Sequence, residues 1–266
     1  MAQTAESIPE WLAVVLLGII EGITEFLPVS STGHLLLAQQ WLDARSDVFN
    51  VVIQSGAVLA VLFVFKERSL QIAQRWRERE TQDYIFKMGT AFAITCAGGL
   101  ILKITNFELP DEAKPVAISL IVGGVIFVVL EMWIKGKALS ETITWPIAVA
   151  IGFGQLVAAV FPGASRSGTT IVIAMAMGLN RRMAVEFTFL LGVPTLLAAG
   201  AVKMLSAFKD GVFSEDIGML VLGTVISAIV AFISVKWLLT FLQKYTFIAF
   251  GWYRIILGAL VLMFVK

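Results

Sequence analysis

Long apolar stretches alternate with short polar ones along this 266-residue chain. A helix needs roughly 20 apolar residues to cross the hydrocarbon core of a bilayer. Stretches close to that length recur along the chain, and each predicts a membrane-spanning helix. About six such spans are expected, at residues 50–65, 84–104, 115–134, 185–206, 217–240 and 247–265.

Two further apolar segments are interrupted by a proline and a group of hydroxyl-bearing residues. They predict two helix pairs, at residues 11–27 plus 31–43 and at residues 146–161 plus 167–180. A helix over residues 31–43 would be roughly 20 Å long, which is short of the ~30 Å hydrocarbon core. We therefore predict two re-entrant hairpins, although two tight pairs of ordinary spans would give the same parity.

The positions of Lys and Arg predict which loops face the cytoplasm, because cytoplasmic loops are enriched in these residues. Residues 66–87 form the longest hydrophilic stretch and contain six of them. We expect this stretch inside, together with the basic positions at 135–137, 181–182 and 244. The mainly acidic residues 106–114, and the loop that follows residue 209, are expected outside.

The two halves of the chain share their polar and helix-breaking positions. Because three spans follow each hairpin, an odd number, the halves must have opposite orientations, as in the inverted repeats of many transporters. We predict an all-α polytopic membrane protein with one membrane domain, residues 1–266, built from repeats at about 8–134 and about 142–266. Adding 134 to the residue number carries Gly18 onto Gly152, Glu21 onto Gln155, Pro28 onto Pro162 and Ser31 onto Ser165.

Composition narrows the possible functions. Hydrophobic residues make up 58% of the chain and charged residues 15%, which is too apolar for a typical soluble domain. The net charge of +1 leaves no basic stripe for nucleic acid. Cys96, the single cysteine, has no partner for a disulfide or a zinc site, and we expect it in the core.

The first interruption carries two carboxylates and the chain's single histidine. Glu21 and Glu25 are four residues apart and share a helix face, where they could bind Mg²⁺ or Ca²⁺, share a proton or act as a general base. Pro28 should end the helix, and Ser30 or Ser31 should cap the next one.

His34 lies three residues after Ser31, within reach of the serines across one helical turn. Its side chain is suited to proton transfer near neutral pH. A lone histidine is more often a structural residue, but the neighbouring serines favour a catalytic role.

The second interruption combines a helix start with a permanent positive charge. Ser165 should cap the helix, whose free N–H groups attract anions, and Arg166 can bind phosphate oxygens bidentately. Ser167, Thr169 and Thr170 add hydroxyls. With the first interruption, these parts match the needs of phosphoryl transfer, where positioning and charge neutralisation dominate. A transporter or flippase of a phosphorylated lipid or anion is the alternative, since it could share the same architecture.

Two motifs resemble the paired signatures of the undecaprenyl-diphosphate phosphatase family, also called the bacitracin-resistance proteins. They are Glu-Gly-Ile-Thr-Glu-Phe-Leu-Pro-Val-Ser-Ser-Thr-Gly-His at residues 21–34 and Pro-Gly-Ala-Ser-Arg-Ser-Gly-Thr-Thr at residues 162–170. The resemblance covers essentially the whole chain. It implies an enzyme that removes the terminal phosphate of undecaprenyl diphosphate, recycles the lipid carrier for peptidoglycan synthesis and confers bacitracin resistance.

The resemblance further implies an inverted repeat of six spans and two re-entrant hairpins, often dimeric, in the bacterial inner membrane. We expect its cleft to open to the periplasmic side and to receive a polyprenyl diphosphate from the surrounding membrane lipid. A divalent cation, Mg²⁺ or Ca²⁺, is implied, with Glu21 and Glu25 as its ligands. The implied catalytic residues are Glu21, Glu25, Ser31, His34 and Arg166, and the expected substrate-binding residues are Ser30, Thr32, Ser165, Arg166, Ser167 and Thr170.

Overall fold

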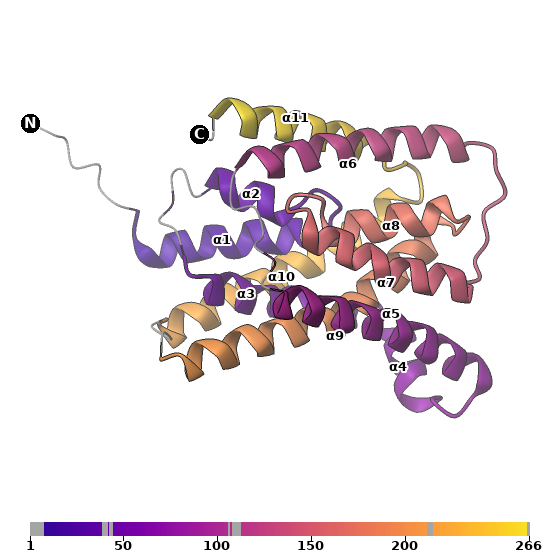
Figure 1. Ribbon diagram of the computed structural model, residues 1–266, viewed down its shortest axis with the longest axis horizontal. Helices are drawn as coiled ribbons and strands as arrows, with labels where there is room; N and C mark the ends of the chain where they lie inside the picture. The colour runs from indigo at the N-terminus through magenta and orange to yellow at the C-terminus, as the bar shows by residue number, and fades with distance from the viewer. Residues whose placement is uncertain are drawn as a thin grey trace, which may run out of the picture.

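The computed structural model describes residues 8–38, 42, 45–105, 107, 113–211 and 215–264. Within these residues the chain forms eleven α-helices and no β-strand (Figure 1). Parts of the predicted helix at 31–43 and of the loops at 106–114 and 209–216 fall outside the described residues. The helices are α1 (Glu10–Thr24), α2 (Ser31–Ala38), α3 (Asp47–Val64), α4 (Lys66–Gln74), α5 (Arg79–Ile104), α6 (Ala113–Ile134), α7 (Trp145–Val160), α8 (Arg166–Ala176), α9 (Arg181–Lys209), α10 (Ile217–Phe241) and α11 (Ile248–Phe264).

Four of the described helices, α5, α6, α9 and α10, are long and apolar enough to cross a bilayer. Helix α3 reaches this standard only together with α4, and the two are bent by 80° at their junction. Helix α11, with 17 residues, is shorter. The chain is therefore an all-α polytopic membrane protein, as predicted. The count of about six spans stays a prediction, because it requires α3 and α11 to cross as short helices.

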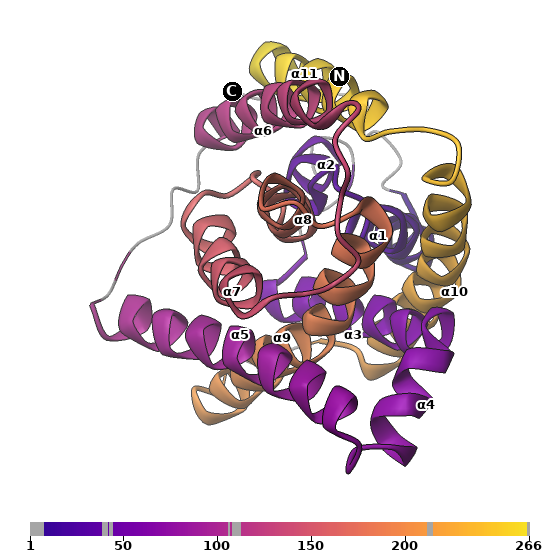
Figure 2. The ribbon, with the colours of Figure 1, turned by 90° about the vertical axis from the view of Figure 1, so that its right-hand side faces the viewer.

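The two predicted helix pairs enter from opposite ends of the molecule. Helix α1 runs from the N-terminal end to the middle, and α2 runs back towards that end (Figure 1). Helices α7 and α8 do the same from the other end. The end-on view places α1, α2 and α8 in the middle, with α5, α6, α10 and α11 around them (Figure 2). The two turns between paired helices therefore meet inside the protein.

Two ion pairs connect the basic loops at one end of the molecule. Arg68 of α4 lies 2.7 Å from Glu186 at the start of α9. Arg181 pairs with the fully buried carboxylate of Glu131 at the end of α6. The backbone N–H of Phe247, just before α11, donates to the same carboxylate at 2.9 Å. The loops that the basic pattern predicts on one side therefore do share one end of the molecule.

Several of the helix contacts fall into exchanged pairs. Helix α1 packs on α10 and α7 on α5, while α2 packs on α11 and α8 on α6. Helices α3 and α9 contact each other, as do α6 and α11. We match α1, α2, α3, α5 and α6, in that order, with α7, α8, α9, α10 and α11. Exchanging each helix for its match turns the α1–α10 contact into the α7–α5 contact and the α2–α11 contact into the α8–α6 contact. It leaves the α3–α9 and α6–α11 contacts unchanged. Two halves related by a two-fold axis would produce this exchange.

Two glycines set the close approach of α6 and α11. A Cβ added to Gly124 would lie 2.5 Å from the carbonyl oxygen of Gly251. A Cβ added to Gly258 would lie 2.7 Å from the carbonyl oxygen of Ala117. At both positions the space is too small for any residue other than glycine. The two contacts are also related by an offset of 134 residues, which carries Gly124 onto Gly258 and Ala117 onto Gly251. Small residues allow this kind of close backbone packing between membrane helices.

Cys96 does not lie in the core. Its side chain is exposed on α5, most of whose residues are not buried within the protein. The prediction was wrong because apolar sequence alone does not separate a lipid-facing position from a protein-facing one in a membrane helix.

The glycine contact can be tested by comparing Gly124→Ala with Gly99→Ala, since a Cβ on Gly99 of α5 would meet no atom within 4 Å. Gly124→Ala should destabilise the protein by about 1–3 kcal/mol, because α6 and α11 must move apart to admit the methyl group. Thermal unfolding in detergent would measure this. Equal melting temperatures for the two variants would contradict the packing described.

Candidate active site

Two turns of non-helical backbone meet in the middle of the molecule, and we call them the first elbow (residues 25–30) and the second elbow (residues 161–165). Each ends in a serine with a positive φ angle, 71° at Ser30 and 69° at Ser165. These are the two non-glycine residues with positive φ in the described part of the chain. Such a conformation costs of order 1–3 kcal/mol and persists only where its surroundings enforce it.

Both serines cap the helix that follows. The hydroxyl oxygen of Ser165 accepts a hydrogen bond from the backbone N–H of Gly168 at 3.2 Å. The hydroxyl oxygen of Ser30 accepts one from Gly33 at 3.4 Å. The predicted cap at Ser165 is confirmed. In the first half Ser30 takes this position, and Ser31 is the first residue of the helix itself.

The match of Ser31 with Ser165 was therefore wrong by one position. In conformation and in hydrogen bonding Ser165 corresponds to Ser30, an offset of 135 residues. The second elbow contains one more residue between its proline and its serine than the first, Gly-Ala against Val. A constant offset cannot follow such an insertion.

A cavity of about 160 Å³ lies between the two elbows, and we call it the elbow cavity. Most of its polar lining comes from residues that the sequence singles out. Gln54 of α3 is an addition that no motif indicated. The lining residues are Glu25, Ser30, Ser31, Thr32, Gln54, Ala158, Pro162, Gly163, Ser165, Arg166 and Leu196.

Glu25 connects the two halves through its carboxylate. One oxygen lies 3.2 Å from a guanidinium nitrogen of Arg166. The other accepts a hydrogen bond from the Ser31 hydroxyl at 3.1 Å. The Arg166 and Glu25 side chains are only 14% and 7% exposed, so water screens their charges little. The cavity therefore holds a positive charge, a carboxylate and a hydroxyl within mutual reach.

Glu21 lies one helical turn before Glu25 and is completely buried. Among the described residues neither of its side-chain oxygens has a hydrogen-bond partner. A buried, unpartnered carboxylate is costly unless it binds a proton or a cation. The described residues contain no group of three or more His, Cys, Asp or Glu that could hold a metal. The carboxylates of Glu21 and Glu25 still provide oxygen ligands for a hard cation that keeps several of its waters, such as Mg²⁺.

His34 lies outside the lining of the elbow cavity. Its Nδ1 is 2.7 Å from the carbonyl oxygen of Ser30, and its Nε2 is 2.6 Å from the Tyr253 hydroxyl. A carbonyl oxygen only accepts, so Nδ1 carries the hydrogen and Nε2 of the neutral ring accepts from Tyr253. Both ring nitrogens are therefore engaged. An acid–base role for His34 stays a prediction, and it would require this contact with Tyr253 to open.

Two predicted binding residues, Ser167 and Thr170, do not line the elbow cavity. The buried Ser167 hydroxyl lies 3.3 Å from the carbonyl oxygen of Glu25 and 3.4 Å from that of Leu27, so it donates to the backbone of the first elbow. The Thr170 hydroxyl donates back to the carbonyl of Arg166 at 2.8 Å, within its own helix. Their contacts position Glu25 and Arg166.

Comparison with known proteins gives a match over nearly the whole chain. The family model described as bacitracin resistance protein BacA matches residues 14–260. The chain belongs to this family. It is 50% identical to a protein of Rhizobium etli (strain CIAT 652) named undecaprenyl-diphosphatase, over 95% of this chain and 96% of that protein. A protein of the same name from Xanthomonas oryzae pv. oryzae (strain PXO99A) is 45% identical over the same shares.

Arg254 of α11 is a further site residue of this BacA-family chain, and neither sequence motif contains it. Its side chain is fully buried, and its guanidinium donates to the carbonyl oxygens of Pro28 (3.3 Å), Gly163 (3.1 Å) and Ala164 (2.8 Å). Two more carbonyls, of Ser119 and Leu120 in α6, lie within 3.4 and 3.5 Å. One side chain therefore binds the backbone of both elbows.

A signal for Arg254 was present in the sequence. It is the only charged residue in the predicted span at residues 247–265, and a charge at membrane depth marks a structural or functional site by default. Its partners could not be inferred, because they are backbone atoms that carry no residue-type signal.

Replacing Arg254 tests whether it holds the elbows together. Arg254→Met keeps much of the volume but leaves buried carbonyls without a donor, each worth about 1–3 kcal/mol. We expect a clear loss of thermal stability in detergent, whereas Arg77→Met, at an exposed arginine before α5, should change little. Similar melting temperatures for both variants would show that Arg254 does not stabilise the elbows.

Proposed function

We propose that this protein hydrolyses undecaprenyl diphosphate to undecaprenyl phosphate and inorganic phosphate. The observation that carries the proposal is the meeting of Glu25, Ser31 and Arg166 in one cavity inside an apolar helical protein. The name shared by its relatives supplies the substrate. Hydrolysis returns the lipid carrier for cell-wall synthesis and would account for bacitracin resistance.

The elbow cavity is suited to a phosphate group. Helices α2 and α8 begin at the elbows, and the first backbone N–H groups of a helix attract anions. Arg166 adds a permanent charge that can bind two phosphate oxygens. Its charge is balanced by the carboxylate of Glu25, 3.2 Å away. Binding of the diphosphate would draw Arg166 towards the phosphate oxygens and leave Glu25 bound to Ser31.

We infer that the Ser31 hydroxyl attacks the terminal phosphorus. Its oxygen forms a bond to that phosphorus, and the bond from phosphorus to the bridging oxygen breaks, so undecaprenyl phosphate leaves with the electron pair. The Ser31 proton passes to Glu25, which already accepts its hydrogen bond at 3.1 Å. Water then attacks the same phosphorus, the bond from phosphorus to the Ser31 oxygen breaks, and the proton held by Glu25 returns to that oxygen as inorganic phosphate is released. Because the transition state of phosphoryl transfer is loose, charge stabilisation by Arg166 contributes more than the strength of the base.

A divalent cation, Mg²⁺ or Ca²⁺, is part of the proposal. Glu21 would hold it together with Glu25, because the oxygens of Glu21 have no other partner among the described residues. When bound, such an ion neutralises negative charge on the phosphates.

We propose that the protein lies in the bacterial inner membrane with its basic loops in the cytoplasm. The N-terminal end, from which the first hairpin enters, would then face the periplasm, and the cavity would open to that side. The exchanged helix contacts and the 134-residue offset of the α6–α11 contacts support an inverted repeat with halves at about 8–134 and about 142–266. A homodimer stays a prediction.

Arg166→Ala should lower phosphate release from undecaprenyl diphosphate in detergent by at least about 10²-fold, as loss of a preorganised charge at a transition state does. Arg77→Ala, remote from the cavity, should retain full turnover. Near-normal turnover of Arg166→Ala would refute the assignment. If the unmodified protein binds the lipid diphosphate but releases no phosphate, the transporter or flippase alternative is favoured.

Removal of metal by EDTA should abolish turnover, and added Mg²⁺ or Ca²⁺ should restore it. Glu21→Gln keeps the shape of the side chain but removes a ligand charge, so it should raise the half-saturating Mg²⁺ concentration about tenfold or more, on the scale of a lost metal contact. Calorimetric titration of Mg²⁺ gives a readout independent of turnover. Full activity in EDTA would contradict this part of the proposal.

A further inference from the structure

Two apolar grooves flank the elbows on the outside of the hairpins. The α6–α8 groove, of about 470 Å³, borders the second elbow, and the α10–α11 groove, of about 310 Å³, borders the first. The α6–α8 groove is lined by Ile118, Ser119, Val122, Gly123, Ile126, Phe127, Val157, Phe161, Ala164, Gly168, Thr169, Val172, Ile173 and Arg254. The α10–α11 groove is lined by Ile23, Thr24, Leu27, Val29, His34, Trp237, Phe241, Ala249, Phe250 and Tyr253.

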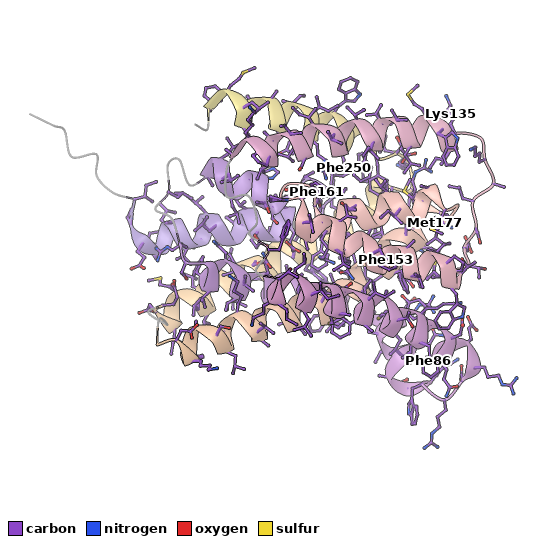
Figure 3. All side chains as sticks on the ribbon, viewed as in Figure 1. Phe86, Lys135, Phe153, Phe161, Met177 and Phe250 are labelled. Carbon is purple, nitrogen blue, oxygen red and sulfur yellow. The ribbon has the colours of Figure 1, made fainter. Side chains whose placement is uncertain are left out.

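The two grooves occupy corresponding places in the two halves. Ile23 and Leu27 line one groove where Val157 and Phe161, 134 positions later, line the other. Phe161 lies near the middle of the molecule, close to the point where the hairpins meet (Figure 3). A ligand of one chemical class could therefore enter either groove, and the side chains that differ between them must decide which one is used.

One groove is bridged by side chains and the other is not. His34 and Tyr253 form a 2.6 Å hydrogen bond across the α10–α11 groove, from α2 to α11. The corresponding positions in the α6–α8 groove are Thr169 and Ser119, at offsets of 135 and 134. These side chains are too short to meet in the same way. The α6–α8 groove is accordingly the larger of the two and lacks this polar bridge.

We propose that the α6–α8 groove binds the polyprenyl tail next to the diphosphate. This inference rests on the proposed hydrolysis of a lipid diphosphate. The groove shares the second elbow with the elbow cavity: Phe161 and Ala164 line the groove, while Gly163 and Ser165 line the cavity. A tail whose terminal phosphate is bound by Arg166 therefore has an apolar surface directly beside its head group.

The groove lining suits a hydrocarbon. Its side chains are apolar apart from Ser119, Thr169 and Arg254, and the Arg254 guanidinium donates its N–H groups to backbone carbonyls. Membrane lipid is as apolar as the tail, so transfer out of lipid contributes little, and affinity must come from shape and van der Waals contact. A bulky side chain that fills the groove should therefore weaken binding of the long tail specifically.

Val122→Trp tests the groove, with Val129→Trp as its matched control. Both valines lie on α6, seven residues apart on the same face, and are 50% and 58% exposed, but only Val122 lines the groove. We compare kcat/KM for undecaprenyl diphosphate with kcat/KM for geranyl diphosphate. Val122→Trp should lower this ratio about tenfold, the scale of a lost apolar pocket contact. Val129→Trp should leave it unchanged.

Ile23→Trp places the same side chain in the α10–α11 groove and should also leave the ratio unchanged. An unchanged ratio for Val122→Trp, or a fall for Ile23→Trp of the same size, would overturn the assignment of the tail to the α6–α8 groove. Binding of undecaprenyl phosphate and geranyl phosphate to the same variants, measured by native mass spectrometry, does not depend on turnover. Failure of hydrolysis and failure of the groove assignment are therefore separate results.

Discussion

Backbone that leaves the helical conformation inside a bilayer has no water to satisfy its polar groups, so it must find partners within the protein. The two elbows meet this requirement through each other and through α11. Arg254 donates to carbonyl oxygens on both elbows, and Ser167 donates from the second half to the backbone of the first. Because these donors are buried, the elbows cannot separate without leaving several carbonyls unpaired.

This cross-linking also explains how two strained serines persist in the middle of the protein. Ser30 and Ser165 adopt φ angles that side-chain-bearing residues avoid, and in exchange each caps the next helix. The two helix starts then converge on the elbow cavity. Glu25 and Arg166 meet there because one lies at the first elbow and the other at the start of α8. The conformational strain and the proposed chemistry therefore have the same structural origin.

The two halves supply the same scaffold but different chemistry. Where the first half has Glu21, the second has Gln155, whose amide donates to Thr95 at 2.8 Å. The second half contributes Arg254 where the first has Leu120. Arg254 donates to the backbone carbonyl oxygen of Leu120, its counterpart in the first half, at 3.5 Å. The repeat thus provides two meeting elbows, and the unmatched polar residues turn them into a single asymmetric site.

Much of the fold and of the candidate site could be inferred from the amino-acid sequence alone. The length of the apolar stretches predicted an all-helical membrane protein, and Pro28 and Pro162 predicted where its helices are interrupted. Glu25 and Arg166 were identified as site residues because they are charged residues within apolar sequence. These features are local, so a linear pattern carries them. Tertiary packing alone decided that His34 contacts Tyr253, that Ser30 matches Ser165, that Cys96 is exposed and that Arg254 binds both elbows. The face of a helix that a side chain occupies, and the distant backbone atoms that it bonds, depend on neighbours that folding brings together. The residue type alone does not predict these neighbours.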